Sequence, residues 1–164
     1  MFYLLYNFLF FSNMLDAYNQ VRANKGSAGI DGITIDEIDD YLRKHWLSTK
    51  ELIKQRKYKP QPVLRVEIPK PNGGVRQLGI PTVMDRMIQQ AIVQVISPIC
   101  EPYFSEKSYG FRPNRSCEQA VIQLLEYLND GYEWIVDIDL EKFFDTVPQD
   151  RLMSLVHNII QDGD

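Results

Sequence analysis

Apolar residues recur at three- and four-residue spacing in several parts of the chain, as they do on the buried face of a helix. The longest repeat follows Thr82 and continues to Pro98, where the missing N–H of proline is expected to end the helix. Thr34, Thr82 and Ser116 each precede an acid or amide three residues later, a spacing that caps helix starts. The apolar positions of the last two helices, including Cys117, are expected to face a core. The pattern predicts helices over residues 14–23, 35–46 and 50–57, and further helices from Thr82, Ser116 and Pro148.

Other segments alternate between apolar and polar residues, which is the period of a half-buried strand. Residues 63–68 and 75–80 flank a turn rich in glycine and proline, and are therefore expected to form a β-hairpin. Residues 134–139 are expected to form a further strand, with apolar side chains on one face and Asp137 and Asp139 on the other. Together with the helices, these strands predict an α+β fold.

The composition is that of an ordinary globular protein, with 45% hydrophobic and 24% charged residues among 164. This length suits one domain or one part of a larger domain. The net charge of -4 conceals an uneven distribution: residues 43–76 hold ten lysines or arginines and two acids, whereas residues 118–150 hold nine acids and one lysine. Such a distribution suits an enzyme that holds a phosphate backbone and a divalent cation, although an uneven surface without function is the alternative.

The two cysteines and two histidines do not have zinc-like spacing, so neither a structural zinc nor a disulfide framework is expected. A chain without such crosslinks suits a reducing compartment, and we expect a cytoplasmic location. Residues 1–13 form an apolar segment of unclear role that lacks the basic region of a signal peptide. Its first eleven residues are too few to span a bilayer. We expect them to pack on the domain or on another chain, which would make a homo-oligomer, and we expect no membrane contact.

Carboxylates gather at the end of the predicted third strand. Asp137, Asp139 and Asp145 follow an apolar run, and carboxylates held by a rigid strand end are good ligands for Mg²⁺. The alternative is a solvated acidic strand end that leads into a loop.

Basic residues and glycines mark three further candidate sites. Lys70 and Arg76 lie at the hairpin turn, where they can hold an anionic ligand or simply keep an exposed tip soluble. The glycines of residues 26–32 are not followed by the lysine of a phosphate-binding loop, so plain turn chemistry is the alternative there. The basic side chains of residues 50–57 either follow a phosphate backbone or are solvated.

Four stretches in this order resemble the group II intron reverse transcriptases, the intron-encoded maturases and their bacterial relatives. They are the glycine loop at 26–32, the segment from Ile-Pro-Lys-Pro to Asp-Arg at 68–86, the Tyr-Gly-Phe-Arg-Pro run at 109–113 and the acidic segment at 137–145.

The resemblance implies roles for five residues. Asp139 corresponds to the first catalytic aspartate, because the aromatic residue that collides with a ribonucleotide sugar lies five positions later, at Phe144. The carbonyl of Leu140 would share a bound Mg²⁺ with Asp139, and Lys70 and Arg76 would hold the triphosphate of the incoming nucleotide.

The resemblance also implies template contacts and a supporting position. Asp137 becomes a neighbour of the metal site instead of a principal ligand. The residues implied to contact the RNA template are Gly26, Ser27, Gly29, Lys54, Arg56, Lys57, Gln89 and Arg112.

By the same resemblance, residues 14–115 form the fingers and residues 116–164 the start of the palm of a right-hand polymerase. The complete enzyme would add deoxynucleotides to a DNA primer on an RNA template by two-metal transfer, using deoxynucleoside triphosphates and Mg²⁺, and intron RNA would be a further partner. The second carboxylate motif of such enzymes, Tyr-X-Asp-Asp, does not occur in the 164 residues. We therefore expect the chain alone to be inactive. The alternatives are a non-catalytic RNA-binding module for splicing, or a decayed self-associating fragment.

Overall fold

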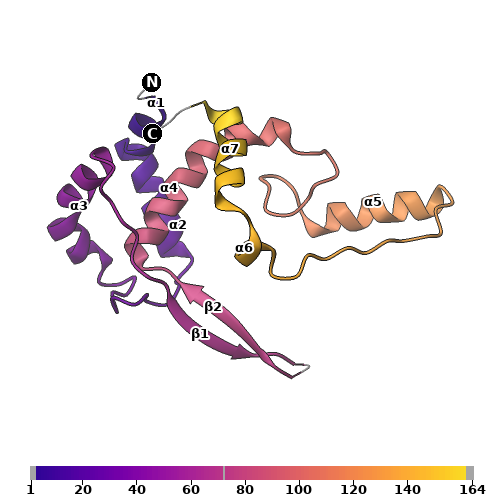
Figure 1. Ribbon diagram of the computed structural model, residues 1–164, viewed down its shortest axis with the longest axis horizontal. Coiled ribbons are helices and arrows are strands. Elements are labelled where there is room, and N and C mark those ends of the chain that lie inside the picture. Colours follow the sequence, from indigo (N-terminus) through magenta and orange to yellow (C-terminus); the bar gives the residue numbers. More distant parts are fainter. Residues whose placement is uncertain (1–2, 72, 162–164) are drawn as a thin grey trace. The chain divides into compact units, whose positions relative to one another are not determined.

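The computed structural model describes residues 3–71 and 73–161, which divide into two compact units. The first unit runs to Ser97 and the second from Pro98 to Gln161. Figure 1 labels the helices and strands of each unit. No described helix is both long enough and apolar enough to cross a membrane. The predicted fingers region, residues 14–115, extends beyond the first unit and stays a prediction.

The core of the first unit is formed by four helices. Met84, Met87, Ile88 and Ala91 are buried along the last of them, as the apolar repeat predicted. The second helix packs along the fourth (Figure 1), where the Asn13 amide donates a 3.1 Å hydrogen bond to the Ala91 carbonyl. The helices are α1 (Tyr3–Phe8), α2 (Phe11–Ala23), α3 (Ile38–Lys54) and α4 (Val83–Cys100).

The apolar N-terminal segment packs on this core. Phe8 and Leu9 are buried in the same cluster as the apolar residues of α4. The prediction that the first eleven residues pack on the domain is therefore confirmed for these two, whereas Tyr6 and Phe11 remain exposed. Residues 1 and 2 lie outside the described part of the chain.

α3 is one helix where the sequence predicts two, at 35–46 and 50–57. The connecting residues contain no glycine or proline, so the helix continues through them. The predicted capping pair does form, because the Thr34 hydroxyl and backbone N–H donate to the Glu37 carboxylate at 2.7 and 3.0 Å. It precedes the helix, which begins at Ile38 and ends at Lys54.

The end of α4 also differs from the prediction. Pro98 lies inside the helix, which continues to Cys100 and into the short 3-10 helix η1 (Glu101–Tyr103). Near a helix end proline removes one backbone hydrogen bond without stopping the last turn.

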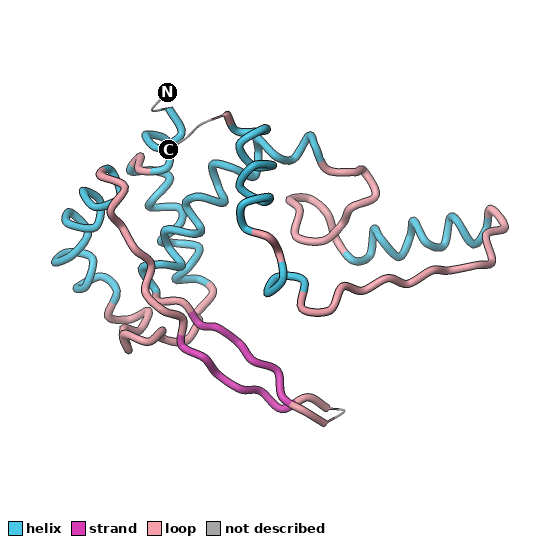
Figure 2. The backbone as a smooth tube through the Cα atoms, in the orientation of Figure 1, coloured by secondary structure: helices cyan, strands magenta, loops and turns pink. Residues whose placement is uncertain are grey.

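The predicted β-hairpin is confirmed. β1 (Leu64–Pro69) and β2 (Val75–Ile80) pair antiparallel, with Pro69 opposite Val75 (Figure 2). At the turn, the Lys70 N–H donates to the Gly74 carbonyl at 3.0 Å. Gly73 and Gly74 have φ values of +83° and +85°, which favour glycine.

The second unit contains three α-helices: α5 (Cys117–Asn129), α6 (Phe143–Thr146) and α7 (Gln149–Ile160). The predicted capping box of Ser116 and Gln119 is present, and Pro148 occupies the N-cap of α7. The prediction that the apolar faces of α5 and α7 are buried is wrong. No described residue of either helix is buried, and Cys117, expected in a core, is exposed. An amphipathic helix buries its apolar face only where another layer covers it.

The predicted strand at 134–139 is also wrong. Residues 132–140 form an irregular segment, and in the described part of the chain β1 and β2 are the only paired strands. Trp134 is 94% exposed, and Val136 and Ile138 are exposed as well. A strand needs a neighbour for its backbone N–H and C=O groups, and alternating side chains do not supply one. Helices with one two-stranded antiparallel sheet still make the fold mixed, as the α+β prediction states.

Candidate nucleotide and template sites

The hairpin brings Lys70 and Arg76 to the same end of the sheet. Arg76 is paired with Ile68 in the register, and Lys70 follows β1 directly. Both side chains are exposed, and neither forms an ion pair with another described residue. Two such cations can meet an anionic ligand, with a planar fork from the arginine and a point charge from the lysine.

A buried carboxylate fixes the other end of the hairpin. Asp85, which is 2% exposed, accepts hydrogen bonds from the Tyr58 hydroxyl at 2.5 Å and the Gln61 N–H at 3.1 Å. It also accepts from the Thr82 hydroxyl at 2.7 Å. Tyr58 and Gln61 precede β1 and Thr82 follows β2, so one side chain joins the two segments that enter and leave the base of the hairpin. Burial, together with the bond to Asp85, raises the pKa of Tyr58, which stays a neutral donor.

The glycine loop docks on the start of α4 at two points. The Arg86 guanidinium donates through Nη2 to the Ser27 carbonyl at 2.7 Å. A Cβ on Gly29 would lie 2.6 Å from Thr82 Cα, closer than any real contact, so only glycine fits there. A Cβ on Gly26 would lie 2.2 Å from Arg86 Nη1. The three residues expected to contact the template, Gly26, Ser27 and Gly29, are therefore held by α4.

A hollow of about 330 Å³ lies beside this loop, between α2 and α4. Gln89, another residue expected to contact the template, is exposed at this hollow. The residues that line it are Val21, Asn24, Arg86, Gln89, Gln90 and Val93.

Three basic residues expected to contact the template, Lys54, Arg56 and Lys57, lie at and just after the end of α3. Lys54 forms an exposed ion pair with Glu51 at 2.8 Å. Arg56 has a φ of +57°, and the Lys57 N–H donates to the Leu52 carbonyl at 2.8 Å, so the chain turns sharply here. All three side chains are exposed.

The acidic segment lies in the second unit. Asp139 and Leu140 are exposed in the irregular segment before α6, and Lys142 turns the chain with a φ of +51°. Phe144 is 90% exposed, with its ring centroid 5.4 Å from that of Phe143. Among the described residues, no group of three or more acids, histidines or cysteines could hold a metal ion. Asp139 is in no ion pair with the described residues, so its oxygens are available to a cation.

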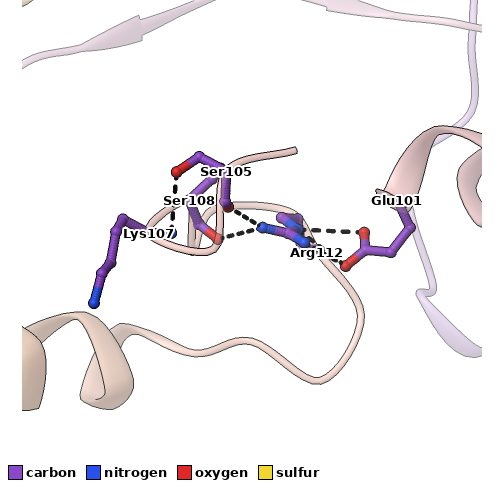
Figure 3. Close-up of polar contacts among 5 residues, drawn as sticks. All are labelled: Glu101, Ser105, Lys107, Ser108 and Arg112. Atoms are coloured by element: carbon purple, nitrogen blue, oxygen red, sulfur yellow. Dashed lines mark hydrogen bonds and ion pairs between the residues drawn. The ribbon is translucent and has the colours of Figure 1, made fainter. Parts of the chain in front are cut away.

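Arg112 lies inside a hydrogen-bonded loop (Figure 3). Its guanidinium donates to Glu101 at 2.7 Å and to the carbonyls of Ser105 and Ser108 at 2.5 and 3.0 Å. The side chain is 8% exposed. The hydrogen bonds from Arg112 hold the pKa of Glu101 below its ordinary value.

The family model for reverse transcriptase (RNA-dependent DNA polymerase) matches residues 68–162, more than half of the chain. The chain belongs to the reverse transcriptase family. The matched segment includes the hairpin turn and β2, the Arg112 loop and the acidic segment.

The similar proteins place the chain among the group II intron members of this family. The Putative COX1/OXI3 intron 2 protein of Saccharomyces cerevisiae is 37% identical over 91% of this chain and 17% of its own length. Protein YkfC of Escherichia coli is 37% identical over 92% of this chain and 41% of its own length. The Group II intron-encoded protein LtrA of Lactococcus lactis subsp. cremoris is 36% identical over 89% of this chain and 24% of its own length. The chain thus spans less than half the length of each of these relatives.

Sequence reasoning missed the roles of three residues that shape these sites. The sequence identifies Thr82 and Asp85 only as a helix cap, and Arg86 only as the end of the 68–86 stretch. A buried acid or a long-range arginine contact leaves no mark in a periodic pattern, although the adjacency of Asp85 and Arg86 within the 68–86 stretch was a signal.

The ion pair between Glu101 and Arg112 predicts an effect of pH on stability. Because the folded pKa of Glu101 is lowered, its contribution to stability is present above the ordinary glutamate pKa of about 4.3. It is lost as the pH falls through the lower folded-state value. Glu101→Gln is therefore expected to destabilise the chain at neutral pH and to weaken the acid dependence of its urea midpoint. Glu106→Gln, in the same loop, is the control. An unchanged acid dependence in Glu101→Gln would contradict the prediction.

Proposed function

We propose that this chain supplies the nucleotide-holding hairpin and the first metal-binding segment of an RNA-directed DNA polymerase of the group II intron type. The observation that carries the proposal is the single family match over residues 68–162, which contains both the hairpin cations and the acidic segment. The polymerase would extend a DNA primer on an RNA template, and intron RNA would be a second partner.

The proposed nucleotide site uses groups that the structure leaves exposed. Lys70 and Arg76 bind the triphosphate of the incoming nucleotide at the hairpin end. Phe144 lies under its sugar, where the ring excludes a 2′-hydroxyl. These roles come from the resemblance of the motifs, and the exposure of all three side chains supports them.

Asp139 and the Leu140 carbonyl are proposed to hold Mg²⁺. This ion commonly takes one or two carboxylates, with substrate phosphates and water as its other ligands. An exposed, unpaired carboxylate beside a carbonyl suits part of such a site, although the described residues do not complete it. When bound, Mg²⁺ neutralises charge on the phosphates during transfer. Because further ligands are needed, we propose that the chain alone is inactive.

All the proposed template contacts except Arg112 lie in the first unit. The loop residues Gly26, Ser27 and Gly29, the basic residues Lys54, Arg56 and Lys57, and Gln89 are proposed to contact RNA by backbone and charge. Because the donors of Arg112 already serve its own loop, we propose that Arg112 contributes to template binding through the shape of that loop.

A chimera tests the proposed function. The chain replaces the matching segment of the Lactococcus relative, and primer extension on RNA is measured for the chimera, the unmodified relative and the chain alone. DNA synthesis by the chimera and none by the chain alone is expected. If the chimera binds RNA but makes no DNA while the relative does, the chain is a non-catalytic RNA-binding module instead.

A further inference from the structure

Arg86 forms a long-range contact that the proposed nucleotide and template sites do not explain. It lies in the first turn of α4 and donates to the Ser27 carbonyl, 59 residues earlier in the chain. Its Nη1 atom occupies the space above Gly26, where a Cβ would be only 2.2 Å away. One guanidinium therefore contacts two consecutive residues of the glycine loop.

The guanidinium is not a freely solvated cation. Its Nε atom is buried and has no hydrogen-bond partner in the described part of the chain. Withdrawing a polar atom from water without a partner is destabilising, so this arrangement calls for an explanation. A cation that reached for phosphates from the surface would keep all its donors in water. A buried Nε, together with a hydrogen bond from Nη2 to the Ser27 carbonyl, instead suits a group that holds the loop backbone.

The loop depends on this support because its other contact with α4 is purely steric. Gly29 lies against the backbone of Pro81 and Thr82 without a side chain of its own. The hydrogen bond from Arg86 to Ser27 is the directional part of the docking. Without it, residues 26–28 keep no described polar tie to α4, and their conformation is free to vary.

We propose that Arg86 is a positioning residue for RNA binding: its guanidinium holds the glycine loop on α4 in the conformation that meets the template. The inference rests on the proposed template role of the loop. Arg86 itself does not contact RNA.

Substitutions of Arg86 separate positioning from direct phosphate contact. Binding of the full chain to a fluorescent RNA hairpin with a single-stranded tail is measured over a range of salt concentrations. Arg86→Ala is expected to weaken binding roughly tenfold to a hundredfold, the loss expected for a charge-assisted hydrogen bond, with an unchanged salt slope. Arg86→Lys is expected to fail nearly as badly, because an ammonium lacks the planar fork. Arg151→Ala, on exposed α7, is the charge-matched control.

The opposite pattern overturns the proposal. A salt slope reduced by about one in Arg86→Ala, with binding restored in Arg86→Lys, would identify a direct phosphate contact. Circular dichroism and thermal melting of each variant show whether it is folded.

Hydrogen exchange measures how firmly the glycine loop is held in the absence of RNA. Arg86→Ala is expected to speed amide exchange across residues 26–32 while the buried part of α4 stays protected. Unchanged exchange in the loop would overturn the positioning role. Faster exchange with unchanged RNA affinity would also overturn the positioning role, because it would show that the loop does not contact the template. The polymerase proposal would then be tested separately by the chimera. An unmodified chain that binds no RNA would count against the proposed function. Hydrogen exchange would still test whether Arg86 holds the loop.

A double-mutant cycle adds a second measurement. Gly26→Ala displaces the guanidinium, so its effect on loop exchange should vanish in the Arg86→Ala background. Gly29→Ala clashes with the backbone of Pro81 and Thr82 in either background, so its effect should persist. Additive effects of the Gly26 and Arg86 substitutions on loop exchange would contradict the proposal that Arg86 holds the loop.

Discussion

Asp139→Ala is expected to reduce primer extension by the chimera on the order of a thousandfold, because positioning and charge stabilisation supply most of the rate in two-metal transfer. Asp139 is exposed in the segment before α6, so removing its side chain leaves no cavity and no unpaired partner. The loss should therefore appear in the rate, with the melting temperature unchanged. Single-turnover extension on an RNA template measures it.

Asp137→Ala is the matched control for this prediction. It removes the same group two residues away, from the same irregular and exposed segment. A modest loss is expected there, because Asp137 is proposed to be a neighbour of the metal site. Equal rates for Asp139→Ala and the unmodified chimera would refute the assignment, and equal losses in the two variants would show that general negative charge matters instead.

Asp85→Ala is expected to lower the free energy of unfolding by roughly 2–4 kcal/mol, because it leaves one buried and two part-buried donors without an acceptor. The Tyr58 hydroxyl, the Gln61 N–H and the Thr82 hydroxyl all donate to this carboxylate. Asp85→Asn keeps the shape but turns one acceptor into a donor, so it should be intermediate. Urea denaturation monitored by circular dichroism measures both.

Asp40→Ala controls for the loss of a carboxylate. Asp40 forms an ion pair with Arg43 in which its side chain is 76% exposed, and such pairs contribute about 0–1 kcal/mol. A similarly small effect for Asp85→Ala would mean that the buried network does not stabilise the first unit.

The first unit follows closely from its sequence because its signals are local. The hairpin is predicted by alternation around a glycine turn, and the start of α4 by Thr82 and Asp85. The register of β1 and β2 is then set by the short turn between them. What the pattern could not show was contact between distant segments, such as that of Arg86 with Ser27.

The structure of the second unit is predicted less well from its sequence, because its patterns depend on neighbours that the sequence does not name. The alternation at 134–139 shows which faces a strand would have, but not whether a neighbouring strand exists to pair with it. The same limit applies to α5, whose apolar stripe predicts burial without naming the surface that covers it. The capping box at Ser116 was predicted correctly because it needs only four consecutive residues.

Because the hairpin is held by Asp85 at its base, a small rotation there becomes a larger displacement at its turn. Each strand has six residues, so the turn lies about 20 Å from the base. A rotation of about 5° at the base would displace the turn by about 2 Å, and an error of that size in placing a reacting group can reduce a rate about a hundredfold. If Lys70 and Arg76 hold a triphosphate, the accuracy of their grip is therefore set by a buried carboxylate at the far end of the arm.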